Sequence, residues 1–186
     1  ISLKNWDADF IAMPGHKGLL GPQGTGLLLC GRNPKPLFFG GTGSNSREQT
    51  MPEFLPDRLE AGTLNVPGIA GLDAGLRYVN RMGLQEIFRR EHTQLVTCVH
   101  GLKKMGFRVF SGEHQATTVS FVPGEDCEEF GESLARRGIA VRAGLHCAPL
   151  AHESVGTLET GTVRVSFGHN ATDRHTGEFL RILAQL

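Results

Sequence analysis

A sharp break between two short apolar runs is the feature that most constrains the fold. Residues 9–13 and 27–30 are short and apolar, which favours two buried strands. The first run ends at a Pro-Gly pair, and a glycine-rich turn occupies residues 21–26. His16 and Lys17 therefore follow the end of the first predicted strand. Because ligands of open α/β sheets bind at the carboxyl ends of the strands, this turn is the first candidate site.

Two kinds of chemistry can be weighed for Lys17. A lysine amine that loses its water on folding becomes a nucleophile able to form a Schiff base, whereas spacing alone favours an ordinary solvated lysine in a turn. A nucleotide-binding P-loop is disfavoured, because no Gly-Lys-Ser/Thr follows the glycines.

The segment Gly-His-Lys, followed by Gly-Pro-x-Gly-x-Gly at residues 21–26, resembles the cofactor-lysine segment of pyridoxal-phosphate enzymes of the class-V aminotransferase type. Cysteine desulfurases and selenocysteine lyases are members of this group. The resemblance implies that Lys17 holds pyridoxal 5'-phosphate through its amine and that His16 approaches the phosphate. Pro14 departs from the pattern, since the family often has Ser there, and the contact of that hydroxyl with the phosphate is absent.

Residues 58–65 carry a second resemblance to the same family, in the segment Glu-Ala-Gly-Thr-x-Asn. There the Gly-Thr pair crosses a dimer interface and reaches the cofactor phosphate of the other subunit. The resemblance implies that Gly62 and Thr63 serve the partner's site and that a homodimer forms through residues 40–65. The structural alternative is that the same segment leads into a helix, with Asn65 as the residue that caps the N-terminus of that helix.

The long stretch before that motif, residues 31–65, is rich in Gly, Pro, Asn and Ser and shows no period. Loops of this length are usually functional, although composition equally favours a flexible surface loop. Within it, residues 38–45 could bring backbone N–H groups close to an anion or a neighbouring chain.

Residues 142–149, Arg-Ala-Gly-Leu-His-Cys-Ala-Pro, form the second candidate site. A cysteine on a loop beside a histidine and near arginines can be a reactive thiol, whereas most free cysteines are small buried hydrophobes. A metal site of His146, Cys147 and His152 lacks a fourth ligand. The segment resembles the catalytic-cysteine loop of cysteine desulfurases, which implies that Cys147 is the nucleophile and that His146 orients or deprotonates groups near it.

The segment at residues 162–172 resembles the next strand of the same enzymes, whose arginine binds the substrate α-carboxylate. The resemblance assigns this role to Arg164, and we place Arg142 in the substrate site with it. A planar guanidinium can hold a carboxylate through two hydrogen bonds. The structural alternative for Arg164 is a salt-bridged strand arginine.

Periodicity predicts the remaining elements. Apolar stripes indicate helices over residues 69–79 and 84–102, and further helices are expected over 125–137 and after Thr172. Strands are expected at residues 107–110, 117–121, 139–142 and 162–166. This order makes the fold class α/β, with residues 84–186 as a small α+β domain of βαβ-like order. The family resemblance implies that residues 1–83 are part of the large domain of a fold-type I pyridoxal-phosphate enzyme.

Composition excludes several function classes. Lys plus Arg equals Asp plus Glu, at 19 each, so no global basic field attracts nucleic acid or anionic lipid. No apolar run approaches the roughly 20 residues of a membrane span. The four cysteines form no CxxC pair, which favours free thiols in a reducing cytoplasm.

Parts of the family's site have no counterpart here. In these enzymes the Asp on the pyridine nitrogen, a Gln, a stacking His and a phosphate loop precede the lysine strand. We therefore expect a C-terminal portion that binds pyridoxal phosphate poorly alone, from an enzyme that moves sulfur from L-cysteine to a Cys147 persulfide and then to an acceptor protein. The alternatives are an aminotransferase or selenocysteine lyase on the same scaffold, or an inactive dimerising fragment.

Overall fold

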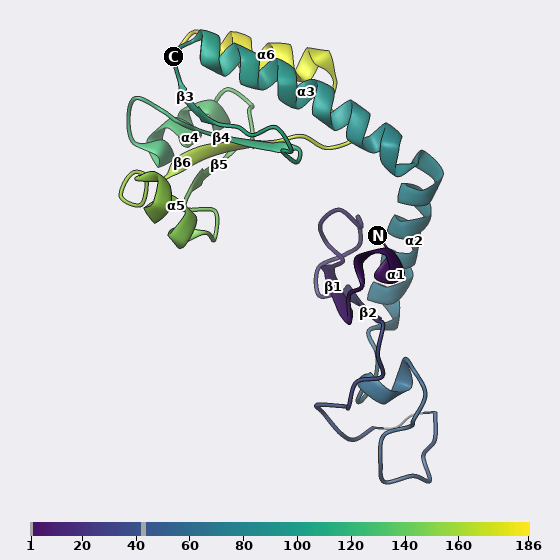
Figure 1. Ribbon diagram of the computed structural model, residues 1–186. Coiled ribbons are helices and arrows are strands. Elements are labelled where there is room, and N and C mark those ends of the chain that lie inside the picture. Colours follow the sequence, from purple (N-terminus) through teal and green to yellow (C-terminus); the bar gives the residue numbers. More distant parts are fainter. Residues whose placement is uncertain (1, 42–43) are drawn as a thin grey trace. The chain divides into compact units, whose positions relative to one another are not determined.

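The computed structural model describes residues 2–41 and 44–186, and its chain divides into two compact units, residues 1–83 and 84–186. The first unit holds the short helix α1 (Leu3–Trp6), the strands β1 (Phe10–Pro14) and β2 (Gly26–Cys30), the 3₁₀ turn η1 (Asp57–Leu59) and the helix α2 (Val66–Met82). The second unit holds α3 to α6 and β3 to β6 (Figure 1).

The two strands predicted around the lysine turn are present, but the prediction that they are buried is wrong, because no residue of β1 or β2 is buried. β1 and β2 pair antiparallel, with Met13 opposite Leu27 and Pro14 opposite Gly26. The turn at residues 15–25 therefore closes a hairpin, so its two ends are fixed by the strand ladder. Neither α1 nor η1 was predicted, because both are too short to show a period.

The lysine turn packs against α2 through small residues. Asn65 caps the helix as predicted, since its side chain accepts a hydrogen bond from the N–H of Gly68 at 3.0 Å. The predicted stripe is partly wrong: Leu72 is buried, but Ile69 is 46% exposed. Gly75 lies on the buried face instead, where an added Cβ would stand 2.5 Å from the carbonyl of Leu19. The close approach of backbone to helix explains why a glycine, rather than an apolar side chain, occupies this face.

The second unit is built on an antiparallel sheet in the order β3-β4-β6-β5. Its strands are β3 (Arg108–Phe110), β4 (Thr118–Val122), β5 (Arg142–Gly144) and β6 (Thr162–Ser166). Since β4 and β5 both pair antiparallel with β6, they run parallel to each other, and α4 (Cys127–Ala135) connects them as a split βαβ unit. The strand predicted at 139–142 was placed too early: paired residues begin at 142.

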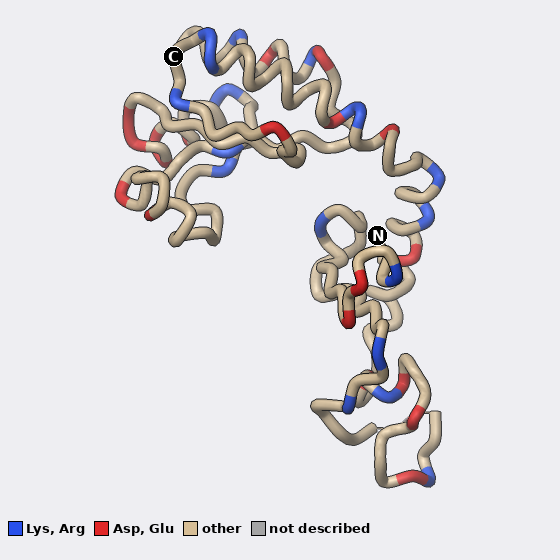
Figure 2. Tube along the Cα trace, in the orientation of Figure 1, with Lys and Arg blue, Asp and Glu red and all other residues tan. Residues whose placement is uncertain are grey.

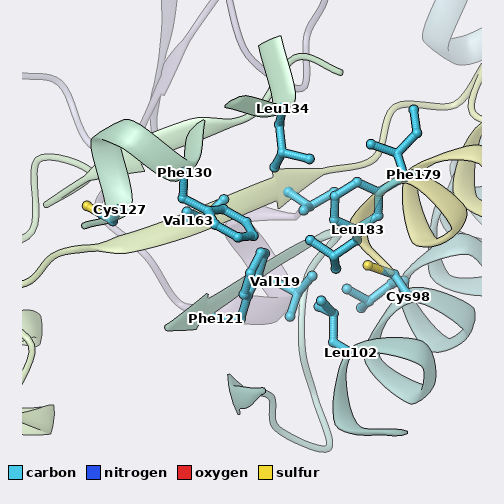
Figure 3. Close-up of a cluster of buried hydrophobic side chains, with 13 residues drawn as sticks. Cys98, Leu102, Val119, Phe121, Cys127, Phe130, Leu134, Val163, Phe179 and Leu183 are labelled. Carbon is cyan, nitrogen blue, oxygen red and sulfur yellow. The ribbon is translucent and has the colours of Figure 1, made fainter. Parts of the chain in front are cut away.

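Helices cover the sheet unequally. α3 (Leu84–Lys104) and α6 (Asp173–Leu183) lie side by side over one face, and α5 (Pro149–Val155), which was not predicted, lies on the other side (Figure 1). The core fills the space between the sheet and α3, α4 and α6, as Figure 3 shows for Leu102, Phe121, Leu134, Val163 and Phe179. The opposite face carries most of the polar side chains of the sheet.

Charged side chains of both signs are interspersed along the chain (Figure 2). On α3, hydrogen bonds from Arg89 and Arg90 lower the pKa of Glu86 to about 2.

None of the described helices is both long and apolar enough to cross a membrane.

A buried polar network joins α3 to α6, and its loss should destabilise the second unit. Gln94 donates to Asp173 at 2.8 Å and accepts from the hydroxyl of Thr176 at 2.7 Å. Gln94→Leu would leave the buried Thr176 hydroxyl without its partner, so we expect the free energy of unfolding to fall by about 1–3 kcal/mol. Urea denaturation of the full-length protein measures this. Gln85→Leu, at an exposed position of α3, is the matched control. Equal stability of the two variants would contradict the prediction.

Candidate functional site

The lysine turn presents two polar side chains to solvent. The N–H of Gly15 donates to the carbonyl of Thr25 at 2.8 Å, and the N–H of Gly21 donates to the carbonyl of Gly15 at 2.8 Å. These bonds hold the turn closed, while His16 and Lys17 are exposed. The amine of Lys17 is therefore accessible, and the desolvation on which the sequence argument relied is not supplied by the described residues.

The second predicted cofactor segment lies in a loop region of the first unit. Gly62 has φ +86° and donates its N–H to the carbonyl of Gly40 at 3.2 Å. A Cβ on Gly41 would stand 2.6 Å from the Cα of Gly62, so two glycines let these loop segments meet. Residues 42–43 of the predicted anion-binding stretch lie outside the described residues.

A cavity of about 730 Å³ adjoins this contact. It is lined by the hydroxyl-bearing residues Ser44, Ser46 and Thr63, and also by Asp57 and Glu60. Hydroxyls are suitable donors to a phosphate, whereas the two carboxylates repel one, so the hydroxyl-bearing residues are the part of the lining that fits an anion.

One face of the sheet in the second unit carries the polar residues predicted for the substrate. Val163 and Val165 of β6 belong to the core, so Thr162 and Arg164 face the other way. Arg142 stands directly opposite Arg164 in the β5–β6 ladder, and paired residues share a face. The Nε atom of Arg164 is buried and lacks a hydrogen-bond partner among the described residues. A guanidinium whose buried Nε has an unmet donor is suited to an anionic ligand.

The thiol of Cys147 is exposed on a tight turn after β5. His146 and Cys147 have φ values of +54° and +62°, a left-handed conformation that costs about 1–2 kcal/mol per residue without a glycine. Arg142 donates from Nη2 to Sγ of Cys147 at 3.2 Å. An accessible sulfur beside a cation is the environment of a reactive thiol.

The other cysteines differ from Cys147. Cys98 and Cys127 are buried, and burial raises the pKa of both thiols, that of Cys98 to about 12. Both belong to the hydrophobic core of the second unit. Cys30 is half-buried in β2.

His146 is held by residues of two other elements. Its Nε2 lies 2.9 Å from the hydroxyl of the buried Thr162, and its ring centroid lies 5.6 Å from that of His152. His152 is itself buried and bonded to the hydroxyl of Thr157 at 2.8 Å. Burial, followed by the charges of Arg164, His152 and Arg142, lowers the pKa of His146 to about 4, so its ring is neutral at pH 7.

The structure thus brings four of the predicted residues together and adds one residue that was not predicted. Arg142, His146, Cys147 and Arg164 share one face of the second unit with Thr162, and we call these five residues the cysteine cluster. Sequence reasoning missed Thr162, although the alternation around Val163 places it on the same face as Arg164. Among residues 2–41 and 44–186, no group of three or more His, Cys, Asp and Glu side chains is arranged to hold a metal ion. His16, Lys17, Gly62 and Thr63 belong to the first unit.

Comparison with known proteins identifies the family of the chain. The family model described as "Aminotransferase class-V" matches residues 1–176. The chain belongs to the class-V aminotransferase family. Among curated relatives of this family member, a probable cysteine desulfurase of Methanothermobacter thermautotrophicus is 32% identical over 96% of the chain and 46% of the relative. A probable cysteine desulfurase of Xylella fastidiosa is 35% identical, over 96% and 44%.

Solved structures of the family agree with the fold. The apo structure of the cysteine desulfurase from Thermococcus onnurineus NA1 has a TM-score of 0.86 and 33% identity, covering 98% of this chain and 48% of that one. The cysteine desulfurase CsdA from Escherichia coli has a TM-score of 0.86 and 30% identity, covering 98% and 47%. The chain therefore spans about half the length of the relatives it matches, and the predicted fold-type I architecture is confirmed.

Proposed function

We propose that this chain is part of a pyridoxal-phosphate-dependent cysteine desulfurase that releases alanine from L-cysteine and keeps the sulfur as a persulfide on Cys147. The observation that carries the proposal is the exposed Cys147 thiol at 3.2 Å from Arg142, on the same sheet face as Arg164, whose buried Nε lacks a hydrogen-bond partner among the described residues. A nucleophile and a carboxylate-binding group are the two features that sulfur abstraction from an amino acid requires.

The residues of the first unit fit the cofactor. The exposed amine of Lys17 can form a Schiff base with the aldehyde, and His16 stands next to it on the turn. Gly62 and Thr63 would contribute to the phosphate site of a partner subunit. Pyridoxal phosphate, when bound, supplies an electron sink for the substrate α-carbon. We assign residues 1–83 to the large, cofactor-binding domain and residues 84–186 to the small domain.

The homodimer belongs to the same proposal. The loop that precedes Gly62 exposes three consecutive apolar side chains, with Leu37 82%, Phe38 73% and Phe39 68% exposed. Contiguous exposed apolar residues usually mark an interface, which supports assembly through this loop region.

In the proposed reaction the side chains hold the substrate, move its protons and accept its sulfur. Arg164, together with Arg142, holds the substrate carboxylate and so fixes the position of its sulfur. Nζ of Lys17 takes the proton from the α-carbon and returns a proton to the product. The thiolate of Cys147 attacks the cysteine sulfur, so that an S–S bond forms while the C–S bond breaks, and the electron pair of that bond is protonated to give alanine. The persulfide sulfur then passes to a thiol of an acceptor protein.

Product analysis of the full-length protein tests this function. With L-cysteine as the only amino acid and a thiol reductant, a desulfurase forms alanine and sulfide in equal amounts and needs no keto acid. An aminotransferase on the same scaffold would form alanine only from added pyruvate and would leave the sulfur of the donor in place. A keto-acid requirement without sulfide would therefore overturn the proposal. Selenocysteine, offered in parallel, separates a selenocysteine lyase from a desulfurase.

The guanidinium of Arg164 should matter more for its geometry than for its charge. Arg164→Lys keeps the cation but loses the planar fork, so we expect kcat/KM for L-cysteine to fall by about 10–100-fold, mainly through KM. Arg137→Lys, at an exposed position just after α4, is the matched control. Steady-state alanine release measures both. An unchanged KM would contradict the assignment of Arg164 to the carboxylate.

A further inference from the structure

The turn that presents Cys147 adopts an unfavourable backbone conformation. His146 and Cys147 are consecutive left-handed residues, at φ +54° and +62°, and neither is a glycine. Such a conformation persists only where surrounding contacts enforce it. Two side-chain contacts are available for this purpose: Arg142 reaches Sγ from β5, and Thr162 reaches His146 from β6.

The contact with Thr162 is the more rigid of the two. Thr162 is 2% exposed, and its backbone is fixed in the ladder opposite Gly144. Its hydroxyl lies 2.9 Å from Nε2 of His146, whereas Arg142 is an exposed residue with a long, flexible side chain. A short, buried, β-branched side chain loses little entropy when it holds a partner.

From these contacts we propose that Thr162 is a positioning residue for the Cys147 nucleophile: its hydroxyl anchors the His146 ring, and the anchored ring holds the left-handed turn that keeps Sγ beside Arg142. His152 supports the arrangement from the other side, since its ring lies 5.6 Å from that of His146 and is itself fixed by Thr157.

The same contacts define what His146 does. Nε2 is engaged by Thr162, while Nδ1 is buried and has no partner among the described residues. A ring that is neutral at pH 7 and bonded through one nitrogen serves as an anchor without adding a positive charge beside Arg142 and Arg164. That the turn is anchored stands on the geometry alone, whereas the consequence for sulfur transfer rests on the proposed function.

Thr162→Val tests the proposal in the full-length protein, because valine keeps the shape of threonine and removes only the hydroxyl. Alkylation of Cys147 by iodoacetamide, followed by mass spectrometry of its peptide, reports the thiol without substrate or cofactor. We expect the alkylation rate and kcat to fall about tenfold, with KM for L-cysteine changed less than about twofold. Thr162→Ser should restore most of both rates. The control Thr97→Val removes a hydroxyl from an exposed position of α3 and should leave both unchanged.

His146→Ala breaks the same contact from the other side, so it keeps the test decisive if Thr162→Val does not fold. We expect it to slow alkylation by a similar factor, and the double variant to be no slower than either single one. Alkylation rates equal to those of the parent in either single variant, or multiplying effects in the double variant, would overturn the proposal. If the parent released no alanine, the proposed function would fail while the alkylation comparison still decided the role of Thr162.

Discussion

Cys147→Ala should abolish alanine and sulfide formation from L-cysteine, with a loss of at least about 10³-fold in kcat. The expectation follows from the proposed chemistry, since without this sulfur no acceptor receives the substrate sulfur and the C–S bond has no route to break. Binding should persist, because Arg164 and the cofactor residues are unchanged. The measurement is alanine release by the full-length protein, together with the loss of the persulfide mass on the peptide that contains residue 147.

The control for this variant is another thiol of the same chain. Cys30 is half-buried in β2, and Cys30→Ala removes a sulfur outside the cysteine cluster. It should release alanine at a rate close to that of the parent. If Cys147→Ala retained alanine release at the parental rate, the relay of sulfur through Cys147 would be wrong, and the alternatives of an aminotransferase or a lyase with an incidental cysteine would stand.

Lys17→Ala should remove the covalent hold on the cofactor and reduce turnover by at least about 10³-fold. The amine both binds the aldehyde and moves the α-proton in the proposed reaction, so no other group replaces it. The purified variant should lose the visible absorbance of the bound cofactor on dialysis. In the parent, borohydride reduction should fix the cofactor mass to the peptide that contains Lys17, which is a readout independent of activity.

An exposed lysine elsewhere in the chain provides the comparison. Lys104 lies in the last turn of α3, and Lys104→Ala should retain both the colour and the activity of the parent. A borohydride adduct on any lysine other than Lys17, or a Lys17→Ala protein that stays coloured after dialysis, would show that the lysine turn was assigned wrongly.

The sequence by itself determined most of the local elements and the family. The hairpin around Lys17, the capped start of α2 and the final helix all follow from apolar runs, turns and caps, which depend on near neighbours in the chain. The resemblance of four motifs in order identified the family, and the family model and the relatives confirm it. The short elements α1, α5 and β5 were missed or misplaced, since a few residues show no period.

Only the tertiary structure decided which polar side chains meet. Thr162 is an ordinary strand residue until the β5–β6 pairing and the turn at 146–147 bring it to His146, 16 residues earlier in the chain. Ile69 matches the predicted stripe yet is exposed, whereas Gly75 lies on the buried face, where residues 19–20 approach α2 closely. The physical reason is the same in both cases: periodicity records which face of an element is apolar, whereas hydrogen bonds and close backbone contacts depend on what packing brings opposite that face.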